Sequence, residues 1–105
     1  MNTEKILKYA GLAAAQRSIV CGSDLVMKEI RKKGGAICVL LSSDASERTK
    51  KQIKDKCAFH NVFLCCLDCD METLGKRFGK ISPTAVAAVT NPGLCRQIKE
   101  IAAEN

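Results

Sequence analysis

Hydrophobic and polar positions alternate along this chain in two distinct patterns. In some stretches apolar side chains return every three or four residues, which is typical of amphipathic helices. These stretches predict helices over about 3–15, 23–33, 46–60, 70–79 and 92–102. Between them lie short runs rich in apolar and β-branched residues, which predict strands over 18–21, 36–41, 62–67 and 85–89. The last three runs are continuously apolar, so we expect these strands to be buried on both faces.

Polar residues and glycines mark the ends of the expected helices. Thr3, Ser23 and Asp70 stand where a side-chain oxygen can cap the first turn of a helix. Asn91 stands in the same position before a proline, which is favoured at the first helical residue. Gly34 follows the second helix and supplies the positive φ that often ends one.

Helices that alternate with doubly buried strands predict a sheet covered on both faces, an α/β fold of the three-layer α/β/α sandwich type. A length of 105 residues favours a single domain over 1–105. In such folds ligands tend to meet the loops that follow strands and the helix starts beyond them. The loops of interest are therefore 21–24, 42–46, 66–70 and 90–92.

Charge favours a polyanionic partner. The chain has 17 Lys and Arg against 11 Asp and Glu, a formal net charge of +6, and a small basic domain often binds RNA or DNA. Aromatic residues make up only 4% of the chain. Tyr9, Phe59, Phe63 and Phe78 mostly occupy positions that we expect in the core, which disfavours an open single-strand binder. The shape and backbone of structured RNA are the better match.

The sequence offers no signature of catalysis. It contains neither G-x-G-x-x-G nor G-x-x-x-x-G-K-[ST], and its single histidine, His60, has no serine nucleophile nearby in sequence. We therefore expect no enzyme activity, no cofactor and no small-molecule substrate. The apolar runs are too short to span a bilayer and the first ten residues do not form a secretory signal, so we expect a cytoplasmic protein without a membrane partner.

Seven cysteines leave one alternative chemistry open. Cys66 and Cys69 form a C-x-x-C, which is half of a zinc site or a redox pair, and Cys57 with His60 could supply a second pair of ligands. Most cysteines lie in apolar runs or on helix faces, where a thiol is a small core residue. We expect buried or incidental thiols and no metal ligands here.

Three segments of the chain look like the ribosomal protein L7Ae family, and more closely like its short bacterial relatives. They read GLAAAQRSIVCGSDLVMKEIRKKG, VLLSSDASERTKKQIKDKC and LGKRFGK with AVAAVTN, and the most specific parts are SSDAS-x-x-T-K-K and L-G-x-x-x-G. The resemblance covers almost the whole chain. It implies an L30e-like sandwich with a mixed four-stranded sheet. It also implies binding of kink-turn RNA, a sharply bent helix–internal loop–helix element, as part of a ribosomal or other ribonucleoprotein particle that offers protein partners as well.

The resemblance also implies which residues contact RNA. They belong to the turn and helix start after the first strand, the loop after the second strand and the loop before the last strand. We add two basic residues that lie close to these segments in the sequence: Arg31, three residues after Lys28, and Lys80, directly before Ile81. The full predicted set is Gly22, Ser23, Asp24, Leu25, Lys28, Arg31, Ser43, Asp44, Lys80, Ile81, Ser82, Pro83 and Thr84.

Two positions depart from the family pattern. Kink-turn binders of this family carry a polar pair such as Asn-Glu or Lys-Gln where this chain has Asp24 and Leu25. An aspartate still accepts a hydrogen bond from a guanine amino group, but a leucine makes no such bond. An alternative therefore stays open, in which the same fold carries a degenerate RNA site that serves as a protein-interaction module.

Overall fold

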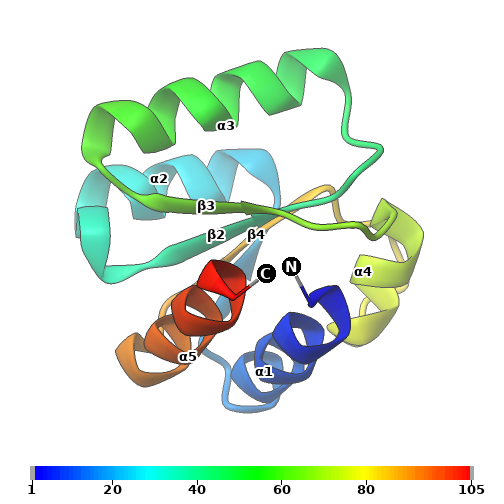
Figure 1. The fold of residues 1–105 in the computed structure, drawn as a ribbon. Helices are drawn as coiled ribbons and strands as arrows, with labels where there is room; N and C mark the ends of the chain where they lie inside the picture. Colours follow the sequence, from blue (N-terminus) through cyan, green and yellow to red (C-terminus); the bar gives the residue numbers. More distant parts are fainter. Residues whose placement is uncertain (1, 105) are drawn as a thin grey trace.

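A computed structural model describes residues 2–104, which form five α-helices, one 3₁₀ turn and four strands (Figure 1). In chain order they are α1 (Thr3–Ala15), β1 (Ile19–Cys21), α2 (Ser23–Lys33), η1 (Gly34–Ala36), β2 (Cys38–Leu41), α3 (Glu47–His60), β3 (Phe63–Cys66), α4 (Met71–Arg77), β4 (Val86–Val89) and α5 (Pro92–Ala103). Every element predicted from the pattern is present. Among the described residues no helix is both long and apolar enough to cross a bilayer.

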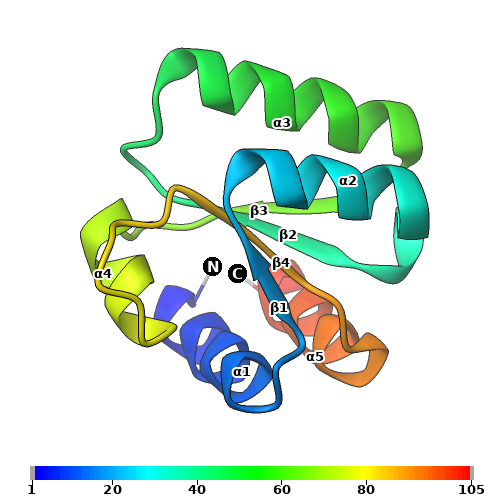
Figure 2. The ribbon, with the colours of Figure 1, turned by 180° about the vertical axis from the view of Figure 1, so that it is seen from behind.

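The four strands form one mixed sheet in the order β1-β4-β2-β3. β4 pairs antiparallel with both β1 and β2, and β2 pairs parallel with β3. α2 and α3 cover one face of the sheet, while α1, α4 and α5 lie on the other (Figures 1 and 2). The predicted three-layer sandwich and its mixed four-stranded sheet are therefore confirmed.

Each face of the sheet has its own apolar core. The core under α2 and α3 includes Val26, Ile30, Val39 and Ile53. The core under α1, α4 and α5 includes Ile6, Leu40, Leu74 and Ile98. Successive residues of β2 alternate between the two cores, as the pleat of a doubly covered strand requires.

Two expectations about burial were wrong. β3 is an edge strand that pairs only with β2, so Phe63 and Leu64 are half-buried and Cys66 is exposed. Phe59, expected in the core, is 83% exposed because it lies two residues beyond the buried Cys57 and therefore on the far side of α3. The cap of α1 is also one residue earlier than expected: Asn2, not Thr3, accepts from the Lys5 N–H at 3.1 Å.

Strand direction gathers most of the loops at one end of the sheet. β1, β2 and β3 all end where β4 begins, as the pairings of Cys21 with Ala87 and of Leu41 with Val86 and Cys66 show. The turn before α2, the loop after β2 and the segment before β4 therefore lie at this end. The C-terminal ends of α2 and α3 lie at the opposite end (Figure 1).

Candidate functional site

A groove of about 390 Å³ lies where β1 ends and β4 begins. It is lined by Cys21, Gly22 and Ser23 on one side and by residues 80–86 on the other. These two segments are far apart in the sequence, and both were predicted to contact RNA. The structure brings them together in a single concave surface.

Gly22 fixes the geometry of the first wall. Its backbone has φ +97°, a conformation that residues with a side chain rarely adopt. Its N–H donates to the Val86 carbonyl at 3.0 Å, and its own carbonyl accepts from the Val26 N–H at 2.9 Å. The same residue thus ties the end of β1 to β4 and starts α2.

The start of α2 is open. Ser23 was expected to cap this helix, but it is the first helical residue, and the cap position falls on Gly22, which has no side chain to accept a hydrogen bond. The other four α-helices within residues 2–104 each have a side-chain cap, supplied by Asn2, Ser46, Asp70 and Asn91. The first backbone N–H groups of α2 therefore have no side-chain acceptor, and they carry the positive end of the helix dipole. Such a helix start favours an anion or another acceptor from a ligand.

The second wall is held in place by α4. The Thr84 N–H donates to the Met71 carbonyl at 2.8 Å, and the Lys80 N–H donates to the Gly75 carbonyl at 2.9 Å. A Cβ atom on Gly75 would lie 2.5 Å from the Ser82 carbonyl oxygen, so only glycine lets the helix approach the loop this closely. This contact explains the first glycine of the L-G-x-x-x-G segment.

The groove presents positive charge and one apolar tip. Lys80 is exposed, and Ile81 is fully exposed at the edge of the loop. Burial raises the pKa of the Cys21 thiol, and the nearby Lys80 charge acts on it in the opposite direction. Lys80 and Cys21 both line the groove. Asp24, in the first turn of α2, is exposed and adds a single negative charge.

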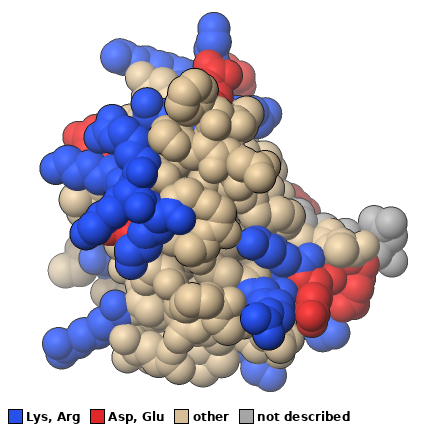
Figure 3. All heavy atoms as spheres, turned by 90° about the vertical axis from the view of Figure 1, so that its left-hand side faces the viewer, with Lys and Arg blue, Asp and Glu red and all other residues tan. Residues whose placement is uncertain are grey.

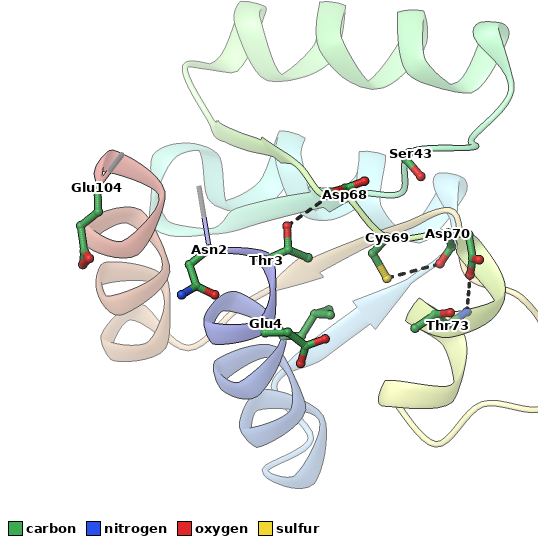
Figure 4. A pocket seen from close by; sticks show the side chains of 10 residues that line it. Asn2, Thr3, Glu4, Ser43, Asp68, Cys69, Asp70, Thr73 and Glu104 are labelled. Atoms are coloured by element: carbon green, nitrogen blue, oxygen red, sulfur yellow. Dashed lines mark hydrogen bonds between the residues drawn. The ribbon is translucent and has the colours of Figure 1, made fainter.

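Ser43 and Asp44 do not line this groove. The Ser43 N–H donates to the Cys69 carbonyl at 2.8 Å, and an Asp44 carboxylate oxygen accepts from the Met71 N–H at 2.8 Å. Ser43 instead borders a depression of about 910 Å³ between the start of α1 and the loop before α4 (Figure 4). Its rim carries four carboxylates: Glu4, Asp68, Asp70 and Glu104. The contribution of Ser43 and Asp44 to RNA binding stays a prediction, and their bonds show a role in joining the loop after β2 to α4.

Arg31 is also distant from the groove. It lies in the last turn of α2, whereas Gly22 and Ser23 lie at the start of that helix. Lys28 stands between the two ends, three residues before Arg31 and thus on the same face of the helix.

The cysteines do not form a metal centre in the described part of the chain, where no three His, Cys, Asp or Glu side chains are grouped to hold an ion. Cys66 is exposed, while Cys69 is buried and donates to the Asp70 carbonyl at 3.5 Å. Burial raises the pKa of both Cys57 and Cys65 to about 11. Such thiols stay protonated at neutral pH and behave as core residues.

Comparison with known proteins finds relatives over most of the chain. RNA-binding protein YlxQ of Bacillus subtilis is 39% identical over 88 residues, which cover 84% of this chain and 85% of that protein. The protein of the same name from Enterococcus faecium is 31% identical over 100 residues, covering 95% and 93%.

Two solved structures share the fold. A protein with unknown function from Bacillus halodurans superimposes with a TM-score of 0.85 at 31% identity, covering 95% of this chain and 98% of that one. The Giardia lamblia 15.5kD RNA binding protein superimposes with a TM-score of 0.81 at 19% identity, covering 99% and 89%. The second likeness shows the fold alone.

The sequence profile of one family matches residues 4–99, nearly the entire chain. With the identities above, this match confirms the resemblance noted in the sequence. The chain belongs to the Ribosomal protein L7Ae/L30e/S12e/Gadd45 family, a non-catalytic family.

Proposed function

We propose that this protein is a non-enzymatic RNA-binding protein of a ribosomal or other ribonucleoprotein particle, and that it recognises structured, kink-turn-like RNA through the groove between β1, α2 and the segment before β4. Its relatives from B. subtilis and E. faecium carry the name RNA-binding protein. The formal net charge of +6 favours the same class of partner.

The open start of α2 is the observation that carries the proposal. Its uncapped N–H groups lie beside a groove whose other wall offers Lys80 and Ile81. A phosphate or a base acceptor satisfies those N–H groups, and Lys80 neutralises backbone charge. The exposed Ile81 side chain supplies an apolar contact for a nucleotide turned out of its stack. A kink-turn offers an acceptor for the N–H groups, backbone charge for Lys80 and an unstacked nucleotide for Ile81, because its internal loop carries both bent backbone and unpaired bases.

A titration against two RNAs tests the proposal. One RNA contains a kink-turn, and the other is a matched duplex without the bulge. We expect a preference for the kink-turn that persists from low to near-physiological salt, because base and shape contacts are less salt-dependent than phosphate contacts. No detectable affinity for either RNA at low salt would overturn the proposal.

A pair of lysine variants locates the contact. Lys80→Ala removes a cation of the groove, and Lys51→Ala removes an exposed cation from α3, outside the groove. If Lys80 contacts a phosphate, its loss weakens binding and makes the negative slope of log K against log salt shallower by about 0.9, the value for one phosphate of duplex DNA. The Lys51 variant changes the total charge equally and should leave this slope nearly unaltered. Equal effects of the two variants would exclude a specific role for the groove.

The second candidate function is a protein-interaction module on the same surface. It is favoured by Leu25, which is 54% exposed in the first turn of α2, and by the exposed Ile81. The double variant Asp24→Asn with Leu25→Glu separates the two candidates. If the site is degenerate, restored polar groups raise the affinity for kink-turn RNA by one to two orders of magnitude, as about 1–3 kcal/mol per base contact implies. If wild-type protein already binds tightly and the variant binds no better, the degenerate-site hypothesis fails.

A further inference from the structure

The end of the molecule opposite the groove carries an exposed aromatic ring. Phe59 lies near the C-terminal end of α3 and is 83% exposed. Its ring meets the His60 imidazole edge to face, with centroids 5.0 Å apart and an interplanar angle of 72°. Phe59 belongs to neither apolar core among the described residues. Its exposed ring is therefore free to meet a ligand.

The segment that ends α2 lies beside the end of α3. A Cβ atom on Gly34 would lie 3.8 Å from the His60 carbonyl oxygen, and one on Gly35 would lie 3.4 Å from that of Asn61. The two helix ends are therefore in contact, as Figure 1 also shows. This contact brings the cations that end α2 to the same end of the molecule as the exposed ring.

Figure 3 shows one face of the molecule, where a dense group of Lys and Arg side chains lies beside a less charged area. The last turn of α2 carries three cations: Arg31, Lys32 and Lys33. Lys33 forms an ion pair with Glu29 at 3.7 Å. Within residues 2–104, Arg31 and Lys32 make no ion pair and are exposed.

Cations in the last turn of a helix also stabilise the helix by interacting with the negative end of its dipole. The three cations at the end of α2 are therefore explained without a ligand. The dipole does not account for Phe59. An exposed ring and unpaired cations at one end of a molecule are the two kinds of group that bind single-stranded nucleic acid, since bases stack on aromatic rings and phosphates pair with cations.

We propose that Arg31, Lys32 and Phe59 form a second RNA contact, the far-end surface, which binds an unpaired strand that extends from the structured element in the groove. This proposal rests on the proposed function. Phe59 stacks on one base, while Arg31 and Lys32 contact the adjoining phosphates.

The exposed face of α2 connects the two contacts. Arg31 and Lys32 follow Lys28 at spacings of three and four residues, so the three share one face of the helix. The helix has eleven residues and is therefore about 16 Å long. A strand that leaves the groove beside Lys28 reaches the far-end surface within a few nucleotides.

The first test measures the effect of an unpaired tail. The kink-turn RNA is prepared with and without an oligouridine tail of about ten nucleotides, a typical site size for single-strand binding. The tail should raise the affinity of wild-type protein about fivefold or more, which is the lower range for one base stacked on an aromatic ring. Phe59→Ser should abolish this gain and leave the affinity for the RNA without a tail unchanged, because Phe59 is remote from the groove.

A tryptophan at the same position gives a direct signal and a conservative rescue. The chain has no tryptophan, so the emission of Phe59→Trp reports on this one position. The tailed RNA should quench this emission, the RNA without a tail should not, and the gain in affinity should persist. Leu12→Trp is the matched control, since Leu12 is also exposed, at 44%, but lies on α1 on the other face of the sheet.

The outcomes separate the two proposals. If wild-type protein binds the kink-turn RNA but the tail adds nothing and the emission of Phe59→Trp does not change at saturation, the far-end surface is not an RNA contact and the proposed function stands. A protein would then be the remaining kind of partner for Phe59. If wild-type protein binds neither RNA, the proposed function and this inference fail together.

Discussion

Two glycines shape the groove at the level of single residues. Gly22 takes a positive φ that places the end of β1 against Val86 and leaves α2 without a side-chain cap. Gly75 lets α4 approach the Ser82 carbonyl more closely than any Cβ atom allows. In the sequence, Gly22 is one of the predicted RNA contacts and Gly75 is the first glycine of L-G-x-x-x-G. The sequence did not show the role of Gly75, because Ser82 reaches it through a loop whose path no local pattern reveals.

Replacement of Gly75 by alanine should therefore destabilise the protein. The new Cβ atom meets backbone of the segment before β4, which cannot rotate away as a flexible side chain would, so we expect a loss of about 1–3 kcal/mol of unfolding free energy. Urea unfolding measures this loss directly.

Gly11→Ala is the matched control for this prediction. Gly11 lies inside α1, and a Cβ atom there would meet nothing within 4 Å. This change should stabilise the protein by about 0.5–1 kcal/mol, because alanine has the higher helix propensity. A Gly75 variant as stable as the wild-type protein would show that the loop moves freely, contrary to its close packing against α4.

Burial should divide the cysteines by reactivity. Cys66 is exposed, whereas burial raises the pKa of Cys38, Cys57, Cys65 and Cys95. The thiolate is the reactive form, so a thiol reagent at neutral pH should modify Cys66 in a fast phase. The four cysteines with a raised pKa should react only when the protein unfolds. Cys66→Ser should remove that fast phase. Fast modification of Cys57 or Cys65 in the folded protein would contradict the burial.

At the level of the elements, helix starts were largely predictable because a cap is a local interaction. Asp70 and Asn91 cap their helices as expected. The expected caps at Thr3 and Ser23 were each one residue too late. At α2 the position of the cap depends on the hydrogen bond from the Gly22 N–H to the carbonyl of Val86, a strand residue more than sixty positions away. Interactions of that range leave no trace in a local pattern.

The Asp70 cap predicts a dependence of stability on pH. The Thr73 N–H donates to the Asp70 carboxylate at 2.7 Å, and the bonds to Thr73 hold the pKa of that carboxyl below its usual value. A lowered pKa in the folded state means that the stabilisation is present above the usual carboxyl pKa, about 4, and is lost as the pH falls through the folded value. Asp70→Ala should therefore lower the urea midpoint at pH 7, and the difference from wild-type protein should shrink in strong acid. A difference that stays constant with pH would show that the charge of Asp70 contributes nothing.

At the level of the whole molecule, the alternation of helices and apolar runs was enough to predict the three-layer sandwich. The order of the strands was not predictable in this way, and so the edge position of β3 was missed. The exposure of Phe59 was within reach of the sequence: Ile53 and Cys57 define the buried face of α3, and Phe59 lies off that face. The core position of Phe59 was expected because the residue is aromatic, although its spacing from Ile53 and Cys57 places it off the buried face.

The two ends of the molecule differ in what they offer to RNA. The groove end combines an uncapped helix start with Lys80 and Ile81, and the far end combines Phe59 with the cations of α2. The molecule is about 28 Å across, a distance that one RNA with a structured element and a short unpaired extension is long enough to span. The acidic depression between α1 and α4 does not lie between the groove and the far-end surface, and its carboxylates should repel the RNA backbone.

A backbone amide spectrum of isotope-labelled protein, recorded while kink-turn RNA is added, reveals which groups of the protein meet the RNA. We expect the largest shifts at the uncapped N–H groups of residues 23–25 and in residues 80–84, because these groups meet the RNA in the groove. Unchanged amides at 23–25 in RNA-saturated protein, with the main shifts around Asp68 and Asp70, would contradict this expectation.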